Sequence, residues 1–493
     1  MSSHLILGAM FRALGAYPSG WRYPGAHNNP LKDPLVLRKT AKLAEAAKFD
    51  FLFFGDWLAT GAELAYSEPH LVAHIDPLSA IGYLAGITRS IGLIATVNTT
   101  YSDPYTLARQ SASVDLLSGG RVGLNIVPGA DPRADANHGR DARGVDGHFV
   151  DGHGANRHWG KEHRYDHATE FVDALRLLWD SWEDDAFVSD RASGTLIDPA
   201  RVHPADYTGE YVSAAGPLNV IRPVQGQLPI MHAGRSPRSR ELMSDVADLA
   251  LVAFTSLPDA LEFTSQLRRQ AASVGRDPTT LKIITPVLPI VAETIEQAQD
   301  IFDTLLQLVP LEGDAAAAAA GARSGSFPAN RSLRALGAAV GVPLRAASLD
   351  VELSTSAAAR FSEYGQQLLE FVVVNTGRML GGERPVTYRH LLAAHVAPAS
   401  SVIVGDAMQV VDHFDTWFSS GAADGFNVLS AFLGGQFAAF TSLVVPELRR
   451  RGLFRAEYEG STLREHLGLS RPQNLHISAL EGADVWGARH ETA

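Results

Sequence analysis

The sequence predicts a (β/α)8 TIM barrel with long insertions at the C-terminal face of the strands. Eight short apolar runs are spread along the chain, and most end in small or polar residues just before a polar or helix-like stretch. Strands that alternate with helices are typical of a closed parallel barrel. The runs cover residues 5–11, 51–55, 91–96, 121–127, 228–233, 249–254, 283–291 and 426–429. Because barrel ligands bind where strands end, we expect functional residues directly after each run.

Helices are expected between these runs. Residues 34–48 place Leu37, Ala41 and Ala44 at three- and four-residue spacings, which makes one apolar stripe, and residues 167–182 show the same pattern. Further helix-like stretches cover residues 238–250, 361–380 and 432–453. The last of them is either the final barrel helix or a subunit interface.

The chain is longer than a barrel requires. A barrel needs about 250 residues, whereas this chain has 493. We expect a single barrel domain over residues 1–493, with insertions at about 128–165 and about 310–404. The first insertion is polar and rich in glycine and histidine, so it is predicted to be a long loop over the barrel mouth. The second, which contains an alanine tract at 315–320, is predicted to be a lid or a helical excursion.

Composition excludes several classes of function. The chain is 46% hydrophobic, yet it has no apolar run as long as the roughly 18 residues of a membrane span. It has no cysteine, which excludes disulfides and thiolate chemistry and favours a cytoplasmic protein. A formal charge of −12 disfavours nucleic acids and anionic membranes as partners. A small organic ligand is therefore expected.

Polar residues follow the second and third runs. Asp56 comes directly after a buried strand, where a carboxylate can accept hydrogen bonds from a ligand or cap the next segment. Asn98, Thr99, Thr100 and Tyr101 follow the third run and either contact a heterocyclic ligand or form an ordinary turn.

The fifth run is followed by a candidate anion site. Gly234 allows close backbone approach, while Arg235 and Ser236 add a positive charge and a hydroxyl at the start of a predicted helix. The same residues also suit a plain strand-to-helix turn. The usual barrel phosphate site lies after strands seven and eight, so this position is not the generic one.

The first insertion also carries evenly spaced histidines. His148, His153, His158 and His163 recur every five residues, a spacing that fits neither one helical face nor a compact ligand pair. No metal site is therefore expected, and the loop is predicted to become ordered over the ligand.

Together, these segments resemble the bacterial-luciferase-like flavin monooxygenases, within them the nitrilotriacetate and dibenzothiophene-sulfone monooxygenase group. The similar segments are KFDFLF at 48–53, TTYSDPY at 99–105 with LAR at 107–109, LSGGR at 117–121, LWDSW at 178–182, GPLN at 216–219 with QG at 225–226, ADGFN at 423–427, VPEL at 445–448 and RGLFR at 451–455. They occur in order over about residues 5–472.

This resemblance implies a two-component monooxygenase. A separate flavin reductase supplies reduced FMN, which reacts with O2 to give a 4a-hydroperoxyflavin that transfers one oxygen atom to a small organic substrate. The protein positions the flavin and excludes water. The resemblance also leads us to expect a homodimer or homotetramer.

The resemblance also assigns cofactor-binding roles. Asp56 matches the strand-end carboxylate near the flavin, and Thr100 matches a polar residue that contacts the same ring system. Tyr165 matches the tyrosine of an Arg-Tyr pair that holds the phosphate end. Ser236, with Arg235, matches a turn that contacts the phosphate.

The chain departs from the family pattern at several positions. Lys161 stands where relatives carry a histidine, although a local gap would bring His158 or His163 there instead. His232 replaces a glutamine, and Ser239 replaces a glycine. Tyr17 replaces a histidine that usually precedes a Trp-Arg pair. These changes affect phosphate binding and substrate choice.

No catalytic acid or base is fixed by the sequence. Tyr17 and His163 are candidates to hydrogen-bond the reacting oxygen or the substrate. Two alternative functions remain open. One is a deazaflavin-dependent barrel dehydrogenase. The other is a non-catalytic barrel in which Arg235 and Lys161 form only an anion-binding site.

Overall fold

The computed structural model shows a closed barrel of parallel strands. It describes residues 4–27, 29, 31–139, 161–314, 328–344, 349–397 and 401–480. The barrel strands, in spatial order, are β1 (Ile6–Met10), β2 (Phe51–Phe54), β3 (Gly92–Asn98), β4 (Val122–Val127), β7 (Ile230–Ala233), β8 (Leu249–Leu251), β9 (Lys282–Val291) and β11 (Gly425–Leu429). β11 pairs with β1 and β8 pairs with β9, so the sheet closes. This confirms the predicted (β/α)8 barrel, and each of the expected runs contains one strand.

Side chains alternate between the inside and the outside of the barrel. Phe51 and Phe53 of β2 point inward and pack with Ile94 and Met231, while Leu52 belongs to the core under the outer helices. The interior is tightly filled. At Gly8 of β1, an added Cβ would lie 2.1 Å from the Phe51 ring. Burial on both faces explains why these strands appear as continuous apolar runs in the sequence.

Helices cover the outside of the barrel. They are α1 (Pro34–Ala46), α3 (Pro77–Ala85), α4 (Pro104–Ser118), α6 (Lys161–Trp179), α7 (Pro237–Val246), α8 (Leu257–Ser273), α15 (Ala407–Ser419) and the continuous stretch of α16 (Gly435–Ala439), η8 (Phe440–Val444) and α17 (Val445–Arg450). The apolar residues predicted for the first helix, such as Leu37 and Ala41, are buried. The 432–453 stretch thus supplies the last barrel helix.

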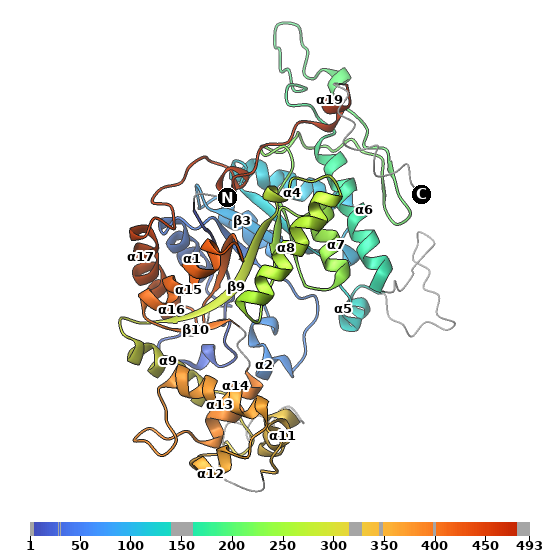
Figure 1. Ribbon diagram of the computed structural model, residues 1–493. Coiled ribbons are helices and arrows are strands. Elements are labelled where there is room, and N and C mark those ends of the chain that lie inside the picture. The colour runs from blue at the N-terminus through green and yellow to red at the C-terminus, as the bar shows by residue number, and fades with distance from the viewer. Residues whose placement is uncertain are drawn as a thin grey trace, which may run out of the picture.

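A helical insertion lies between β9 and α15. The second half of β9 extends beyond the barrel and pairs with β10 (Val402–Gly405). Between them come α9 (Ile295–Gln307), η7 (Ala329–Arg331), α11 (Leu333–Ala339), α12 (Thr355–Ala358), α13 (Glu363–Thr376) and α14 (Tyr388–Val396). Helices α11 to α14 gather at the end of the molecule opposite α19 (Leu475–Leu480) (Figure 1). They share a separate apolar core.

Short elements complete the chain. These are η1 (Gly20–Arg22), α2 (Leu64–Ser67), η2 (Pro69–Leu71), η3 (Thr99–Tyr101), α5 (Pro132–Asn137), η5 (Pro199–Arg201), β5 (Tyr207–Thr208), β6 (Ser213–Ala214), η6 (Pro278–Thr280) and α18 (Leu463–His466). Within the first predicted insertion, α6 already begins at Lys161, before the expected helix start at residue 167. The histidines at 148, 153 and 158 and the alanine tract at 315–320 lie outside the described residues.

The base of the barrel is closed by the C-terminal segment. Leu463, Leu467 and Leu469 pack inside the barrel with Ile6 and Phe51. The opposite end, where the strands finish, therefore remains the open mouth.

Candidate functional site

A cavity of about 830 Å³ lies at the carboxyl ends of the barrel strands. Every barrel strand contributes to its wall, through Met10, Phe53, Thr96, Asn125, Ala233, Leu251, Pro286 and Asn427. Asn330, His395 and Val396 of the helical insertion line it as well. We call this space the mouth cavity. It lies where barrel proteins bind their ligands.

Several buried polar atoms around the mouth cavity have no hydrogen-bond partner among the described residues. They are the Tyr17 hydroxyl, both amide atoms of Asn427, Asn125 Oδ1, His70 Nε2 and Arg12 Nε. Most buried polar atoms in folded proteins do have partners, because leaving one unmade costs free energy. A cavity with such atoms suits a ligand that carries both hydrogen-bond donors and acceptors.

Asp56 lines the mouth cavity, as expected for a residue directly after β2. Its Oδ1 accepts a hydrogen bond from the Trp57 amide at 2.9 Å and lies 2.9 Å from His74 Nε2. The carboxylate therefore both shapes the local turn and holds His74. Its position fits a ligand contact, and its partner His74 was not among the residues predicted from the sequence.

Tyr17 also lines the mouth cavity and is 1% exposed. Its ring packs edge-on against Phe302 of α9, with centroids 5.8 Å apart. Burial raises the pKa of the Tyr17 phenol, so the group stays protonated and acts as a hydrogen-bond donor at neutral pH.

Thr100, in contrast, does not line the mouth cavity. It is 6% exposed, and its hydroxyl donates to the Gly129 carbonyl at 3.1 Å. Arg164 donates to the same carbonyl at 2.8 Å. Thr100 thus helps to connect the end of β3, the segment after β4 and the start of α6.

Tyr165 and Ser236 meet in a cluster of hydroxyls at the N-terminus of α7. The Tyr165 hydroxyl lies 2.9 Å from Ser239 Oγ, which lies 3.1 Å from Ser236 Oγ. Ser236 caps the helix by accepting a hydrogen bond from the Ser239 amide at 3.1 Å. We call Tyr165, Ser236 and Ser239 the hydroxyl cluster. Hydroxyls at a helix N-terminus suit a bound phosphate.

Two neighbours complete this part of the rim. At Gly234, where φ is +147°, an added Cβ would lie 2.5 Å from Ser239 Oγ, so the turn requires glycine. His232 is buried, and its Nδ1 lies 2.7 Å from the Ile126 carbonyl and therefore carries the proton. Burial lowers the pKa of His232 to about 4. Its Nε2, which has no partner among the described residues, is thus an acceptor.

Other predicted residues have different surroundings. Arg235 donates to both carboxylate oxygens of Asp259, at 2.9 and 2.5 Å. His163 is exposed, with Nδ1 2.9 Å from the Tyr211 hydroxyl. Lys161 is the first residue of α6, but its side chain lies outside the described residues. Tyr165 and Ser236 therefore belong to one hydroxyl cluster, and Tyr17 and Asp56 line one cavity. The side chains of Arg235 and His163 bind other partners.

Arg12 is a cavity residue that sequence reasoning missed. It lies two residues after the end of β1 and lines the mouth cavity. The sequence did contain a signal for this residue, namely a charge at the end of an apolar run, because barrel ligands bind where strands end.

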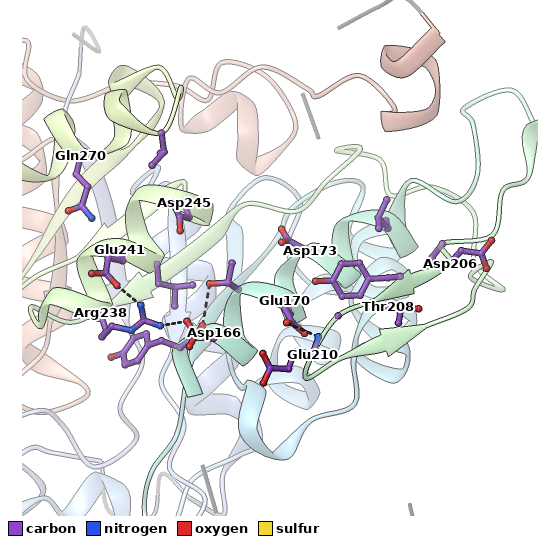
Figure 2. Close-up of a pocket in the computed structure, with 18 residues that line it drawn as sticks. Asp166, Glu170, Asp173, Asp206, Thr208, Glu210, Arg238, Glu241, Asp245 and Gln270 are labelled. Atoms are coloured by element: carbon purple, nitrogen blue, oxygen red, sulfur yellow. Dashed lines mark hydrogen bonds and ion pairs between the residues drawn. The ribbon is translucent and has the colours of Figure 1, made fainter. Parts of the chain in front are cut away.

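A second cavity, of about 900 Å³, lies outside the barrel between α6, α7 and the β5 segment. Figure 2 shows Arg238 between Asp166 and Glu241, with Glu170 directed at the backbone near Glu210. Its other labelled residues are Asp173, Asp206, Thr208, Asp245 and Gln270. Tyr165 of the hydroxyl cluster lies at the edge of this cavity, but the remaining lining is strongly acidic and does not suit an anionic cofactor.

No group of three or more potential metal ligands occurs among the described residues. Within the same residues, no helix is both long and apolar enough to cross a membrane.

Comparison with known proteins identifies the family. The model of the luciferase-like monooxygenase family matches residues 19–424. The chain belongs to this family. The resemblance drawn from the sequence segments is thereby confirmed, and the protein is a monooxygenase of the luciferase-like, flavin-dependent type.

Individual relatives extend over nearly the whole chain. Nitrilotriacetate monooxygenase component A of Aminobacter aminovorans is 34% identical over 486 residues, covering 96% of this chain and 98% of that protein. N-acetyl-S-(2-succino)cysteine monooxygenase of Bacillus subtilis is 33% identical over 477 residues, covering 95% and 98%. The structure of EDTA monooxygenase from Chelativorans sp. BNC1 matches with a TM-score of 0.69 at 26% identity, covering 96% of this chain and 100% of that one.

Proposed function

We propose that this luciferase-like monooxygenase uses reduced FMN, supplied by a separate flavin reductase, and O2 to insert one oxygen atom into a small organic substrate. The second oxygen atom leaves as water and the flavin is oxidised. The hydroxyl cluster, whose two serines follow the cavity-lining residue Ala233 at the end of β7, is the observation that carries this proposal. The name of the Aminobacter relative, a monooxygenase component A, supports a two-component system.

The hydroxyl cluster would hold the FMN phosphate. The hydroxyls of Tyr165 and Ser236 each lie within hydrogen-bond distance of Ser239 Oγ, and the start of α7 directs backbone amides toward the same place. Lys161 and Arg235 are close in sequence to Tyr165 and Ser236, and we propose that they add positive charge. To bind the phosphate, Arg235 would have to release the Asp259 carboxylate to which it donates in this structure.

The rest of the cofactor would extend from this cluster into the mouth cavity. His232 Nε2 is an acceptor suited to a hydroxyl of the ribityl chain. Asn427 presents both an amide donor and an amide acceptor to the cavity, which suits the polar edge of a flavin ring. Asp56 adds a carboxylate acceptor in the same cavity, and we propose that Thr100 helps to position the segment after β4 through its bond to the Gly129 carbonyl.

When bound, reduced flavin supplies the activation of O2. The chain itself positions the reactants and limits the access of water. Tyr17 can donate a hydrogen bond from its protonated hydroxyl, because burial keeps that phenol neutral. The insertion residues Asn330 and His395 narrow the open side of the cavity. His163 remains a second proposed donor, although in this structure it faces Tyr211.

A comparison of FMN with riboflavin tests the phosphate site. Reduced FMN should bind the wild type at least about tenfold more tightly than reduced riboflavin, because hydrogen bonds to a charged group contribute about 1.5–3 kcal/mol each. Ser236→Ala combined with Tyr165→Phe should remove most of this preference. Ser113→Ala, whose hydroxyl bonds the Arg109 carbonyl on α4, is the matched control and should leave it unchanged.

Turnover then tests the reaction. With NADH, a flavin reductase, FMN and O2, we expect oxygenated product from a substrate panel that begins with nitrilotriacetate and N-acetyl-S-(2-succino)cysteine. Tight binding of a reduced deazaflavin without binding of reduced FMN would favour the dehydrogenase alternative. Binding of inorganic phosphate without either flavin would favour the non-catalytic one.

A further inference from the structure

Arg12 occupies a boundary between two cavities. It lines the mouth cavity and also a smaller adjoining cavity of about 250 Å³. Asp56, Glu68 and His70 border both spaces with it. A ligand in either cavity could therefore contact Arg12.

The Arg12 side chain is partly buried, with its Nε fully enclosed, and it has no matched anion in the part of the chain that the structure describes. Among the described residues, no carboxylate forms an ion pair with it, and its Nε has no hydrogen-bond partner. Burial lowers the pKa of Arg12 to about 10, although nearby Glu68 acts in the opposite direction. A buried charge is costly unless it is paired and hydrogen-bonded. Arg12 therefore favours an incoming negative group.

The nearby carboxylates do not neutralise this charge. Asp56 is 2.9 Å from His74 Nε2. The Glu68 side chain is 55% exposed and lies 3.8 Å from His70 Nε2, so water screens much of its charge. Burial, then Arg12 and His74, lower the pKa of His70 to about 3, which keeps that ring neutral.

A second buried guanidinium adds positive potential on this side of the mouth. Arg331 is 1% exposed and donates to two carbonyl oxygens, of Pro310 at 2.9 Å and of Tyr66. No carboxylate forms an ion pair with it within the described part of the chain. Burial lowers its pKa to about 10, and Tyr17 is one of the groups close enough to influence it.

The adjoining cavity is mainly apolar. Phe11, Leu31, Leu37, Leu71 and Ile75 are among its lining residues. A ligand that reaches Arg12 with a negative group can place a small apolar part here. The two features together define a ligand with a charged head and a compact hydrocarbon body.

We propose that the substrate of this monooxygenase carries an oxyanion, a carboxylate or a sulfonate, that Arg12 binds while the apolar part of the substrate occupies the adjoining cavity. This inference rests on the proposed function. Arg12 follows β1, whereas the hydroxyl cluster follows β7, which is opposite β1 in the closed strand order. The site for the substrate anion is therefore separate from the site proposed for the FMN phosphate.

Binding of matched probes tests this proposal. Hexanoate, hexane-1-sulfonate and hexan-1-ol share a six-carbon body and differ in the head group. Calorimetry on the protein with reduced FMN, without O2, should show at least one anion binding at least about tenfold more tightly than the alcohol. Arg12→Met should abolish this difference, and Arg12→Lys should retain part of it because a lysine keeps the charge without the planar fork.

Controls separate this inference from the proposed function. Arg109→Met, at an exposed position on α4, should change neither anion nor flavin binding. The thermal midpoint of Arg12→Met should not fall, since the variant removes an unpaired charge from a partly buried position.

Equal binding of anions and alcohol by the wild type, or undiminished anion binding by Arg12→Met, overturns the proposal. The proposal is also overturned if Arg12→Met loses as much affinity for reduced FMN as it loses for the anion. Anion binding at Arg12 in a protein that fails to bind reduced FMN overturns the proposed function and leaves the anion site standing.

Discussion

At the level of single residues, some buried polar side chains of the barrel are paired and others are not. At the base, Asp50 accepts a hydrogen bond from the Leu7 amide at 2.8 Å and pairs with Arg455 at 2.5 Å. At the mouth, Tyr17 and Asn427 are almost fully buried yet have no partner for their side-chain polar atoms among the described residues. Unmet hydrogen-bonding capacity reduces stability, so its occurrence in several residues that line one cavity indicates a site kept for a ligand.

Replacement of Tyr17 by phenylalanine should separate stability from activity. Loss of the unpaired hydroxyl is expected to raise the free energy of unfolding by about 1 kcal/mol, because a buried polar group without a partner is removed. The same change should lower kcat at least about tenfold if the hydroxyl donates to the reacting oxygen. Urea unfolding and product formation measure the two effects.

Tyr458→Phe serves as the matched control for Tyr17. Its hydroxyl donates to the Phe49 carbonyl at 2.8 Å, near the base of the barrel. Its loss should therefore lower the free energy of unfolding by about 1 kcal/mol and leave kcat unchanged. A Tyr17→Phe enzyme with normal kcat would assign that tyrosine a packing role alone.

At the scale of elements, strands were easier to predict than helix ends. Each apolar run became a barrel strand because a strand buried on both faces needs continuous apolar residues. The start of α6 was missed because residues 161–166 are polar and show no apolar stripe. In the other direction, the predicted helix at 238–250 ends at Val246, and β8 begins at Leu249.

The site residues show the same limit. Asp56 and Ser236 follow strands, so position alone pointed to them. The contact between Tyr165 and Ser239 joins residues 74 positions apart, and the pairing of Arg235 with Asp259 depends on how α8 packs. Such partners are set by tertiary structure, which local patterns do not contain.

The short helix α18 is an element whose role only the structure reveals. Leu463 is fully buried and fills the space that Gly92 and Gly123 leave open on the neighbouring strands. Leu463→Ala should lower the free energy of unfolding by about 2–5 kcal/mol, since it leaves a void in a packed barrel interior. Denaturant unfolding measures the loss.

Flavin binding should be insensitive to that change. Leu463 lies at the base of the barrel, so reduced FMN should bind Leu463→Ala with the wild-type dissociation constant. Leu117→Ala, at a side chain that is 75% exposed, should alter neither stability nor binding. A large loss of flavin affinity in Leu463→Ala would show that the base and the mouth of the barrel are coupled.

For the molecule as a whole, buried histidines make stability depend on pH. Burial lowers the pKa of His70 to about 3 and those of His232, His390 and His466 to about 4, from an ordinary value of 6.5. In the unfolded chain these rings take up protons below about pH 6.5, whereas in the folded protein they remain neutral. Their contribution to stability is therefore complete above pH 6.5 and is lost as the pH falls toward 4.

Among the described residues, three buried carboxyl groups act in the opposite direction, because burial raises the pKa values of Asp50, Asp115 and Asp180. Burial raises the pKa of Asp50 to about 6 from 3.8, so its contribution to stability is greatest at low pH and is lost as the pH rises through 6. Each histidine contributes up to about 1.4 kcal/mol per pH unit within its window. Because the four histidines outnumber the three carboxyl groups, we expect the urea midpoint to fall between about pH 6.5 and pH 5.

A single substitution isolates the contribution of one histidine to the pH dependence of stability. His390 accepts a hydrogen bond from the Thr387 amide at 3.1 Å, and asparagine can accept the same bond without titrating. His390→Asn should therefore reduce the slope of unfolding free energy against pH, between pH 6 and 5, by about 1.4 kcal/mol per unit, whatever it does to stability at pH 7.5. Because only the slope is compared, a loss of packing in the variant does not obscure the result. A parallel slope in wild type and variant would mean that His390 is protonated in the folded protein too, and a midpoint that rises on acidification would mean that the carboxyl groups dominate.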